Sequence, residues 1–375
     1  MLTANAPLRQ FAWWLAAAAV LLVGFGLRVA YDGRDYGQPD EPITVEVVRH
    51  MRLSGDWDTN WAKADLGPEF RYDQYSFSSY LYGTFFFYRF VKLLPWTASW
   101  RGHKAGFFVY RFFSVALASF AMWQAMRIAE RIGRRMAGVG AGALIAVSLL
   151  LVQDAHYVRP EAFTTVLTLA AVGLSCPRSN VRIGAVLGAA TLIGVLVACK
   201  VSMLLLVWLP LVPLAVAWRG RKSDWLLLAA LPLGIVAGFA VGAPGAVAHP
   251  AEFLNGVHRL AEQYAGLQGP HSHLSGGAVG DMLAGYFGAT LGLPVIGCFV
   301  LGALLLGRRK RWAELTLLVG PVLLFAGYFA TRSVFFERNM SHVVPLLLIV
   351  AAFGAVEASS WLAGRRGAPV AVVTI

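Results

Sequence analysis

Long runs of apolar residues alternate with short polar segments along the whole chain. A helix that crosses lipid needs about 20 apolar residues, because the hydrocarbon core is about 30 Å thick. The runs of this kind predict an all-α polytopic membrane protein with about ten transmembrane helices. The predicted spans lie near residues 11–30, 107–126, 137–153, 160–176, 183–199, 201–218, 225–246, 282–306, 313–331 and 343–362.

One further apolar stretch, at residues 77–95, is ambiguous. It is rich in tyrosine and contains Arg89 and Lys92, which is typical of a helix at the membrane interface. If this stretch does not span, the basic clusters between the later runs all fall on the same side as Arg9, as the positive-inside rule requires. We therefore expect 77–95 to lie on the outer surface and both chain ends to be cytoplasmic.

The chain is expected to form a single transmembrane domain over residues 1–375. No small-residue cleavage site follows the first apolar run at 11–30, so this run reads as a retained signal anchor. A new apolar run begins at residues 370–375. This leaves open whether the protein is a short one or is truncated at the C-terminus.

The predicted topology places unequal loops on the outer side. The first, at residues 31–106, holds half of the chain's 20 acidic residues. A second large external loop covers 247–281, and a short third one covers 331–342. Long ordered loops on one face usually carry function, so we expect the site on this side. No inverted repeat of the kind found in many transporters is evident.

The composition agrees with membrane residence. Hydrophobic residues make up 58% of the chain and charged residues 14%, against about 25% charged in soluble domains. The net charge of +12 comes from short basic clusters between apolar runs and not from one basic face, which argues against nucleic-acid binding. The three cysteines form no disulfide framework and no CxxC metal motif. A bacterial plasma membrane is the expected location.

An acidic pair, Asp40-Glu41, follows the first predicted span and precedes a helical stretch at 43–53. Acids in the first turn of a helix interact favourably with its dipole, so simple helix capping is one interpretation. The other is catalytic, because partial desolvation at the membrane surface makes a carboxylate more basic.

A second cluster, "DAHYVRPE", lies between the third and fourth predicted spans on the outer side. It contains Asp154, His156, Arg159 and Glu161, and ionisable groups beside apolar helices are costly unless they are paired or functional. A salt-bridge cluster that anchors the turn is the alternative. The shared side with Asp40 favours a functional role.

Two basic residues complete the candidate site. Lys200 stands alone between two apolar runs, and Arg338 lies in the short external segment before the last span. A lysine that extends to the lipid surface would be unremarkable in itself. Alternatively, Lys200 and the forked donors of Arg338 bind a phosphate at headgroup level. Acidic and basic residues that reach one membrane face suit a reaction on a lipid-linked anionic substrate.

Histidines of the second external loop are candidates for a metal site. His271 and His273 have a ligand-like spacing, but no nearby cysteine or acid completes a set with them or with His249 and His258. We therefore expect no cofactor, and a divalent metal stays an alternative that the sequence does not support. Tyr264 and the glycine-rich stretch 266–280 are interpreted as a flexible flap over a substrate.

Together these residues resemble the polytopic glycosyltransferases of the GT-C superfamily. They are most similar to family 39, the polyprenyl- or dolichyl-phosphate-mannose-protein mannosyltransferase type, and to its bacterial relatives. The family's Asp-Glu pair after the first span matches Asp40-Glu41, and the "SGDW" turn at 54–57 also matches the family. The family's interfacial helices match 77–95, and the arginine at the start of its second span matches Arg111.

Three later segments extend the resemblance over most of the chain. "DAHYVRPEAF" resembles the second acidic motif, and "VACKVSMLLL" resembles a Thr-Lys-Tyr/Gly segment, with Cys199 in place of the threonine. "FERNMSHVVPLLLIVAAFG" is similar to an Arg-Tyr-x-x-Pro motif, with Asn339 in place of the tyrosine.

The resemblance implies inverting transfer of a hexose or pentose from a polyprenyl-phosphate donor to an acceptor hydroxyl on the non-cytoplasmic face. The acceptor would be a protein, a lipid or a glycan. By this resemblance the catalytic residues are Asp40 and Glu41, with Asp40 as the general base. The residues that position acceptor or sugar are Asp154 and His156, and Lys200 and Arg338 bind the donor phosphate.

Two other functions stay open. A transporter or flippase for a lipid-linked or anionic solute would place ionisable residues in the middle of the membrane. Here they collect at one face, which favours an enzyme. A polymerase or ligase of envelope polysaccharides would use an undecaprenyl-diphosphate donor and no aspartate base. Assays of sugar transfer from polyprenyl-phosphate donors separate these possibilities.

Overall fold

The structure is a computed structural model that describes residues 6–30, 40–97, 103–176, 183–266 and 276–365, and all regular elements in these ranges are helical. The α-helices are α1 (Ala6–Val29), α2 (Glu41–Ser54), α3 (Ser78–Lys92), α4 (His103–Ile132), α5 (Arg135–Val147), α6 (Leu149–Ala155), α7 (Glu161–Ser175), α8 (Ile183–Cys199), α9 (Leu211–Ala217), α10 (Lys222–Gly242), α11 (Pro244–Ala248), α12 (Pro250–Tyr264), α13 (Gly276–Leu291), α14 (Leu293–Arg308), α15 (Trp312–Ala330) and α16 (Val344–Arg365). The 3₁₀ turns are η1 (Trp61–Lys63), η2 (Pro95–Thr97), η3 (Val201–Leu206) and η4 (Glu337–Met340).

The apolar helices confirm the predicted all-α polytopic fold. Within the described ranges, five helices are long and apolar enough to cross a membrane, namely α1, α4, α10, α15 and α16. The bent pairs α5–α6 and α13–α14 each match one further predicted span, and shorter apolar helices occupy 161–175, 183–199 and 201–217. These elements cover the positions of the predicted runs, while the total of ten spans stays a prediction.

Several predicted spans are interrupted. The run 137–153 bends by 64° at Ser148, and the run 282–306 bends by 101° between α13 and α14. At the second bend, Gly292 has φ 78°, a conformation that glycine adopts without steric penalty, and a proline follows in the first turn of α14. The run 201–218 divides into η3 and α9 with Pro210 between them, because proline lacks the N–H that would continue a helix.

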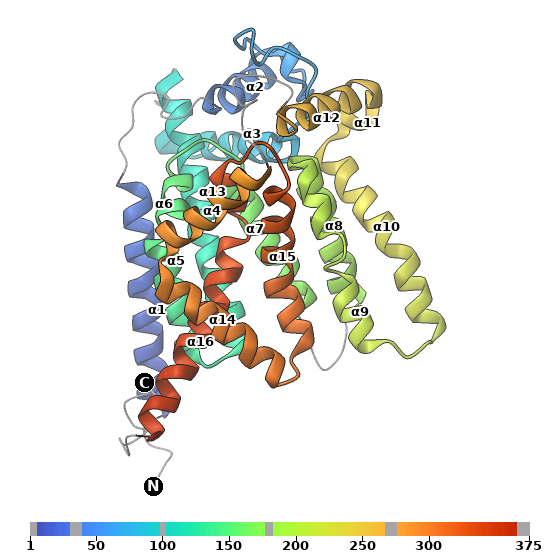
Figure 1. Cartoon of the computed structure of the whole chain (residues 1–375). Helices are drawn as coiled ribbons and strands as arrows, with labels where there is room; N and C mark the ends of the chain where they lie inside the picture. Colours follow the sequence, from blue (N-terminus) through green and yellow to red (C-terminus); the bar gives the residue numbers. More distant parts are fainter. Residues whose placement is uncertain (1–5, 31–39, 98–102, 177–182, 267–275, 366–375) are drawn as a thin grey trace.

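Short helices form a layer at one end of the bundle (Figure 1). Helix α3 lies across the ends of the upright helices, and α2, α11 and α12 lie at the same end. Helix α1 begins and α16 ends at the opposite end of the molecule. The arrangement agrees with the expectation that 77–95 forms a surface helix, and it gathers the two large predicted external loops at one end.

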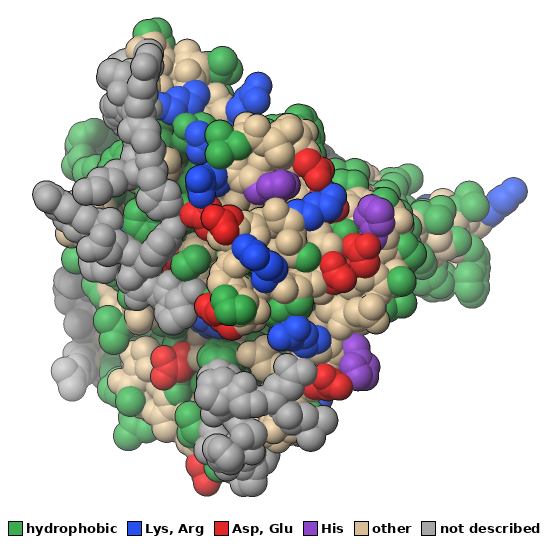
Figure 2. Space-filling model, turned by 90° about the horizontal axis from the view of Figure 1, so that it is seen from above, with side chains coloured by type: hydrophobic (Ala, Val, Ile, Leu, Met, Phe, Trp, Pro, Cys, Tyr) green, Lys and Arg blue, Asp and Glu red, His purple; other side chains and the backbone are tan. Residues whose placement is uncertain are grey.

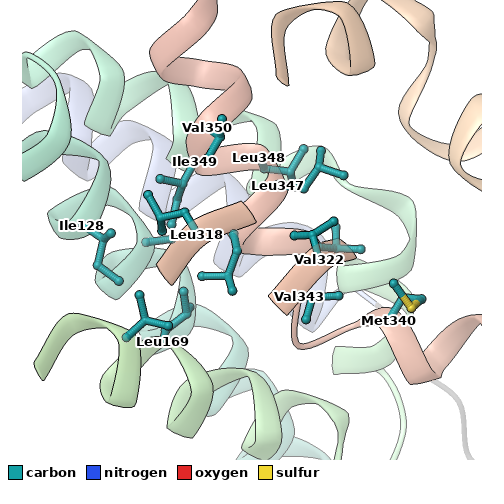
Figure 3. Close-up of a cluster of buried hydrophobic side chains, with 14 of the residues drawn as sticks. Ile128, Leu169, Leu318, Val322, Met340, Val343, Leu347, Leu348, Ile349 and Val350 are labelled. Atoms are coloured by element: carbon teal, nitrogen blue, oxygen red, sulfur yellow. The ribbon is translucent and has the colours of Figure 1, made fainter. Parts of the chain in front are cut away.

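Helix α16 runs through the middle of the bundle and carries much of the core. Figure 3 shows its side chains Leu347–Val350 beside Ile128 of α4, Leu169 of α7 and Leu318 of α15. Helices in lipid associate through close van der Waals packing and not through removal of apolar surface from water. The segment that leads into α16 is therefore held against a rigid core, and this segment carries Arg338.

Helix α8, whose C-terminal end presents Lys200, is held by an unusually close approach of backbones. A Cβ atom added to Gly238 of α10 would lie 2.0 Å from the carbonyl oxygen of Thr191 in α8. Small residues allow such contact between membrane helices, because only hydrogen atoms separate the two backbones. This packing sets the position of α8 and of the lysine at its end.

Candidate functional site

Asp40 stands directly before α2 and faces another part of the chain. It is the N-cap residue, but its side chain makes no capping hydrogen bond. Its Oδ2 instead forms an ion pair with Nη1 of Arg338, and the side chains of Asp40 and Arg338 remain 19% and 23% exposed. Helix capping alone therefore does not account for this carboxylate. It lies at the surface of the site, within reach of a substrate.

Glu41 is fully buried at the start of α2. Nη2 of Arg111 lies 3.3 Å from each of its carboxylate oxygens, and the backbone N–H of Val158 donates to Oε1 at 2.8 Å. Arg111 belongs to α4, and Val158 lies in the turn between α6 and α7. The carboxylate therefore joins three parts of the chain and fixes where α2 begins.

Arg159 stands between two buried carboxylates. Its Nη2 lies 3.5 Å from Oδ1 of Asp154, and its Nε donates to Oε2 of Glu161 at 3.1 Å. Burial lowers the pKa of Arg159, but the adjacent charges of Glu161 and Asp154 outweigh burial and raise that pKa above its usual value. Arg159 is a permanent cation that holds both acids in place. Oε1 of Glu161 also accepts a hydrogen bond from Nζ of Lys200 at 2.8 Å.

The segment around η4 connects these groups to the outer layer. Arg338 pairs with Asp40, and Ser341 donates a hydrogen bond to Oδ2 of Asp154. Between them, Asn339 donates from Nδ2 to the hydroxyl of Tyr264 at 3.0 Å, at the end of α12. Burial raises the pKa of Tyr264, so its hydroxyl stays neutral and can accept this bond.

The described site residues carry balanced charges. The carboxylates are Asp40, Glu41, Asp154 and Glu161, and each pairs with at least one of the cations Arg111, Arg159, Lys200 and Arg338. Among these cations, Arg338 and Lys200 have the most exposed side chains, at 23% and 14%. An anionic substrate would therefore reach these two first, in competition with the carboxylates that they already contact.

The structure brings most of the predicted site residues together. Asp154 and Lys200 meet through Arg159 and Glu161, and Asp154 connects to Arg338 through Ser341 of the same segment. His156 places its Nε2 3.0 Å from the carbonyl oxygen of Leu27 in α1. Its predicted part in positioning the acceptor or the sugar stays a prediction, as do the roles of the other site residues.

Sequence reasoning did not single out Ser341 or the partnership of Tyr264 with Asn339. Neither residue type indicates its partner by its position in the sequence, and only the folded chain shows that Ser341 contacts Asp154 and that Asn339 contacts Tyr264. The sequence assigned no catalytic, positioning or phosphate-binding role to Arg159 and Glu161, and the structure places Glu161 between two cations at the centre of the cluster.

The described residues contain no group of three His, Cys, Asp or Glu side chains placed to hold a metal. His249 and His258 each lie near a glutamate of α12, with Nδ1 3.9 Å from Glu252 and 3.3 Å from Glu262 respectively. His271 and His273, the pair with ligand-like spacing, lie outside the described residues.

Seen from above, the end of the molecule that carries the short helices is strongly polar (Figure 2). Acidic and basic side chains mix across the middle of this face, and hydrophobic side chains lie mostly around its edge. This pattern suits a surface that faces water above a lipid-facing rim. It agrees with a site that a water-soluble group and a lipid headgroup can both reach.

Comparisons with known proteins place the fold. No family model and no curated protein matches the sequence. Among solved structures, ArnT from Cupriavidus metallidurans in the apo state is similar, with a TM-score of 0.58 at 19% identity over 94% of this chain and 60% of ArnT. ArnT bound to undecaprenyl phosphate gives a TM-score of 0.59 at 16% identity, over 97% of this chain and 64% of ArnT.

An oligosaccharyltransferase from Archaeoglobus fulgidus, in a complex with Zn and sulfate, is also similar. Its TM-score is 0.57 at 11% identity, over 93% of this chain and 50% of the oligosaccharyltransferase. ArnT and this enzyme are both GT-C glycosyltransferases. This chain has the GT-C fold. This chain spans less than two thirds of the length of ArnT and half of the length of the oligosaccharyltransferase. The GT-C resemblance is confirmed for the fold, and the narrower likeness to family 39 stays a prediction.

Proposed function

We propose that the protein is a membrane glycosyltransferase that moves a sugar from a polyprenyl-phosphate donor to an acceptor hydroxyl. The observation that carries the proposal is the pair Asp40–Arg338, which joins a partly exposed carboxylate to a partly exposed cation at one end of a GT-C fold. ArnT, a structure with the same fold, has been solved with undecaprenyl phosphate bound. A polyprenyl phosphate fits the need for an anionic head at the surface and an apolar tail in lipid.

The reaction assigns separate tasks to the carboxylate and the cations. Asp40 takes the proton from the acceptor hydroxyl while the acceptor oxygen forms a bond to the anomeric carbon. The bond between that carbon and the phosphate oxygen breaks, and polyprenyl phosphate leaves with the electron pair. Attack opposite to the leaving group inverts the anomeric configuration. Negative charge grows on the phosphate in the transition state, so Arg338 and Lys200 stabilise the transition state more than they stabilise the ground state.

The buried carboxylates take a different role. Glu41 is fully buried against Arg111 and the Val158 amide, so it holds the start of α2 and thereby positions Asp40. This geometry favours a positioning role for Glu41 over the catalytic role expected from the sequence. Asp154 is equally enclosed, by Arg159 and Ser341, and it supports the segment that carries Arg338.

The proposal places the site on the non-cytoplasmic face. The turns that carry Arg219 and Arg221, and Arg309 and Arg311, lie at the end of the bundle opposite to α2 and α3 (Figure 1). Basic residues in short loops favour the cytoplasmic side. The opposite end, with the site, then faces outward, and a bacterial plasma membrane provides polyprenyl-phosphate lipids there.

A reconstitution assay separates the enzyme from a transporter or flippase. The purified full chain in lipid nanodiscs is incubated with a polyprenyl-phosphate donor that carries a radiolabelled sugar and with a membrane extract as a source of acceptors. We expect the label to move from the donor to a new product, with polyprenyl phosphate released. Intact donor in nanodiscs, together with protein-dependent movement of that donor across the bilayer of sealed vesicles, would instead show a flippase.

A further inference from the structure

Arg28 is a charged residue buried within the first predicted span. It lies near the C-terminal end of α1 and is 1% exposed, although neighbouring residues of α1 such as Leu22 and Val23 face outward. Among the described residues, no carboxylate lies within ion-pair distance of its guanidinium. A charged arginine within a membrane-spanning segment is costly unless its donors are satisfied. The presence of Arg28 at this buried position therefore indicates a specific role for its side chain.

The guanidinium of Arg28 donates hydrogen bonds to two carbonyl oxygens at the end of α5 and to one in its own helix α1. Nη2 donates to the carbonyl oxygen of Ile145 at 2.9 Å, and Nη1 donates to those of Ala146 at 3.3 Å and Gly24 at 2.8 Å. Helix α5 ends at the 64° bend at Ser148, whose N–H donates to the Ile145 carbonyl oxygen at a long 3.4 Å. The carbonyls of a last helical turn have few intrahelical donors, so Arg28 adds hydrogen bonds there and fixes the direction in which the chain leaves α5.

The bend determines where Asp154 lies. Helix α6 is short, begins after Ser148 and carries Asp154 in its last turn. Arg28, Asp154 and Glu161 also line one small cavity, which is large enough for roughly one water molecule. Nε of Arg28 and Oγ of Ser148 are both buried without a hydrogen-bond partner among the described residues. The cation therefore lies directly behind the two buried acids of the site.

We propose that Arg28 is a positioning residue that holds the α5–α6 bend and so places Asp154 against Arg159 and Ser341. This inference rests on the proposed function only for its effect on turnover. Figure 1 shows α1 at the edge of the bundle beside α5 and α6, where it can brace the bend from outside. Helix α1 thus contributes to the site through Arg28 as well as anchoring the chain in the membrane.

The variants Arg28→Met and Arg28→Lys test the assignment in the full chain in nanodiscs. Methionine keeps the apolar stem without donors, while lysine keeps a charged donor. We expect Arg28→Met to lower kcat about 10- to 100-fold with the donor KM changed less than about threefold, because a misplaced supporting group harms the transition state more than binding. Arg28→Lys should restore part of the lost kcat.

Hydrogen exchange of the peptide that covers 145–156 provides a readout that does not depend on activity. Arg28→Met should speed exchange there, whereas Arg131→Met, which removes an arginine contact to the Gly173 carbonyl in α7, should not. Unchanged exchange at 145–156, or an unchanged kcat in well-folded Arg28→Met, would overturn the inference. If the wild-type protein transfers no sugar, the proposed function fails, while the exchange experiment still decides whether Arg28 holds the bend.

Discussion

Replacing Asp40 with asparagine is expected to tighten the binding of polyprenyl phosphate, the leaving group of the proposed reaction. Arg338 pairs with the Asp40 carboxylate, and its guanidinium carbon also lies 4.7 Å from the ring centre of Phe336. A phosphate that binds Arg338 must compete with that carboxylate. Asparagine has nearly the same shape without the charge, so the competition disappears.

The exposure of the pair sets the size of the effect. The side chains of Arg338 and Asp40 are 23% and 19% exposed, so the pair is neither fully buried nor fully solvated. An exposed ion pair contributes about 0.2–1 kcal/mol, whereas breaking a buried one costs about 3–5 kcal/mol. We expect an intermediate value of about 1–2 kcal/mol, which corresponds to a roughly 5- to 30-fold lower dissociation constant.

A double-mutant cycle measures the competition directly. Binding of radiolabelled polyprenyl phosphate is followed at equilibrium for the wild type, Asp40→Asn, Arg338→Gln and the double variant in nanodiscs. In the Arg338→Gln background, Asp40→Asn should change the dissociation constant less than about twofold, because the cation under competition is absent. Arg338→Gln alone should weaken binding.

Asp65→Asn is the matched control. It removes the same charge from the same stretch between α1 and α4, but the Asp65 side chain is 82% exposed and pairs with an exposed Arg71 at 3.2 Å. Equal tightening by Asp65→Asn would show that the net charge of the surface controls binding. Binding by Asp40→Asn that is no tighter than in the wild type would refute the competition.

Three further predictions concern stability and its dependence on pH. Glu41→Gln should destabilise the protein by about 3 kcal/mol or more, because it breaks a buried ion pair, whereas Asp65→Asn at an exposed pair should cost less than about 1 kcal/mol. Equal melting temperatures of the two variants would contradict this. Gly238→Ala should lower the melting temperature, because the added Cβ forces α8 and α10 apart. Gly285→Ala should not lower it, because no atom lies within 4 Å of the added Cβ. Equal effects of the two variants would refute the close packing of α8 and α10. Burial lowers the pKa of His342 from 6.5 to about 3, so between these values the unfolded chain binds a proton that the native state excludes. The free energy of unfolding should therefore fall with decreasing pH in this range, by up to about 1.4 kcal/mol per pH unit. His342→Gln should reduce this slope. Parallel curves of melting temperature against pH for the variant and the wild type would contradict the prediction.

The helical fold and the layer of short helices were predictable because their signals are local. The length of an apolar run and the placement of basic residues between runs are both read from neighbouring positions. The bends were harder to predict, since an apolar run does not reveal how its helix continues. Gly292 and Pro210 are of residue types that interrupt helices, whereas the bend at Ser148 is held by Arg28, from a different helix.

The members of the candidate site were predictable because lipid makes ionisable groups conspicuous. Asp154 and Lys200 stand at the ends of apolar runs, where a charge is unusual, and Asp40 and Arg338 lie in polar segments beside such runs. Their pairing was not predictable, because partners such as Asp40 and Arg338 lie far apart in the sequence. Arg28 is the missed signal, since a single arginine within the first apolar run obeys the same rule.

The neighbouring acids Asp40 and Glu41 also show why the sequence alone could not assign roles to the site residues. Asp40 and Glu41 are adjacent acids of similar chemistry, yet one is partly exposed and the other fully buried. Only the folded chain distinguishes them, because Arg111 and the Val158 amide enclose Glu41 and leave Asp40 at the surface.

The central claim is that Asp40 acts in glycosyl transfer from a polyprenyl-phosphate donor. Single-turnover conversion of a labelled donor by purified protein in nanodiscs, with an acceptor present, tests this most directly. We predict that the wild type releases polyprenyl phosphate in step with labelled product, and that Asp40→Asn lowers this rate at least about 100-fold while still binding the donor. A rate in Asp40→Asn equal to that of the wild type would contradict the account.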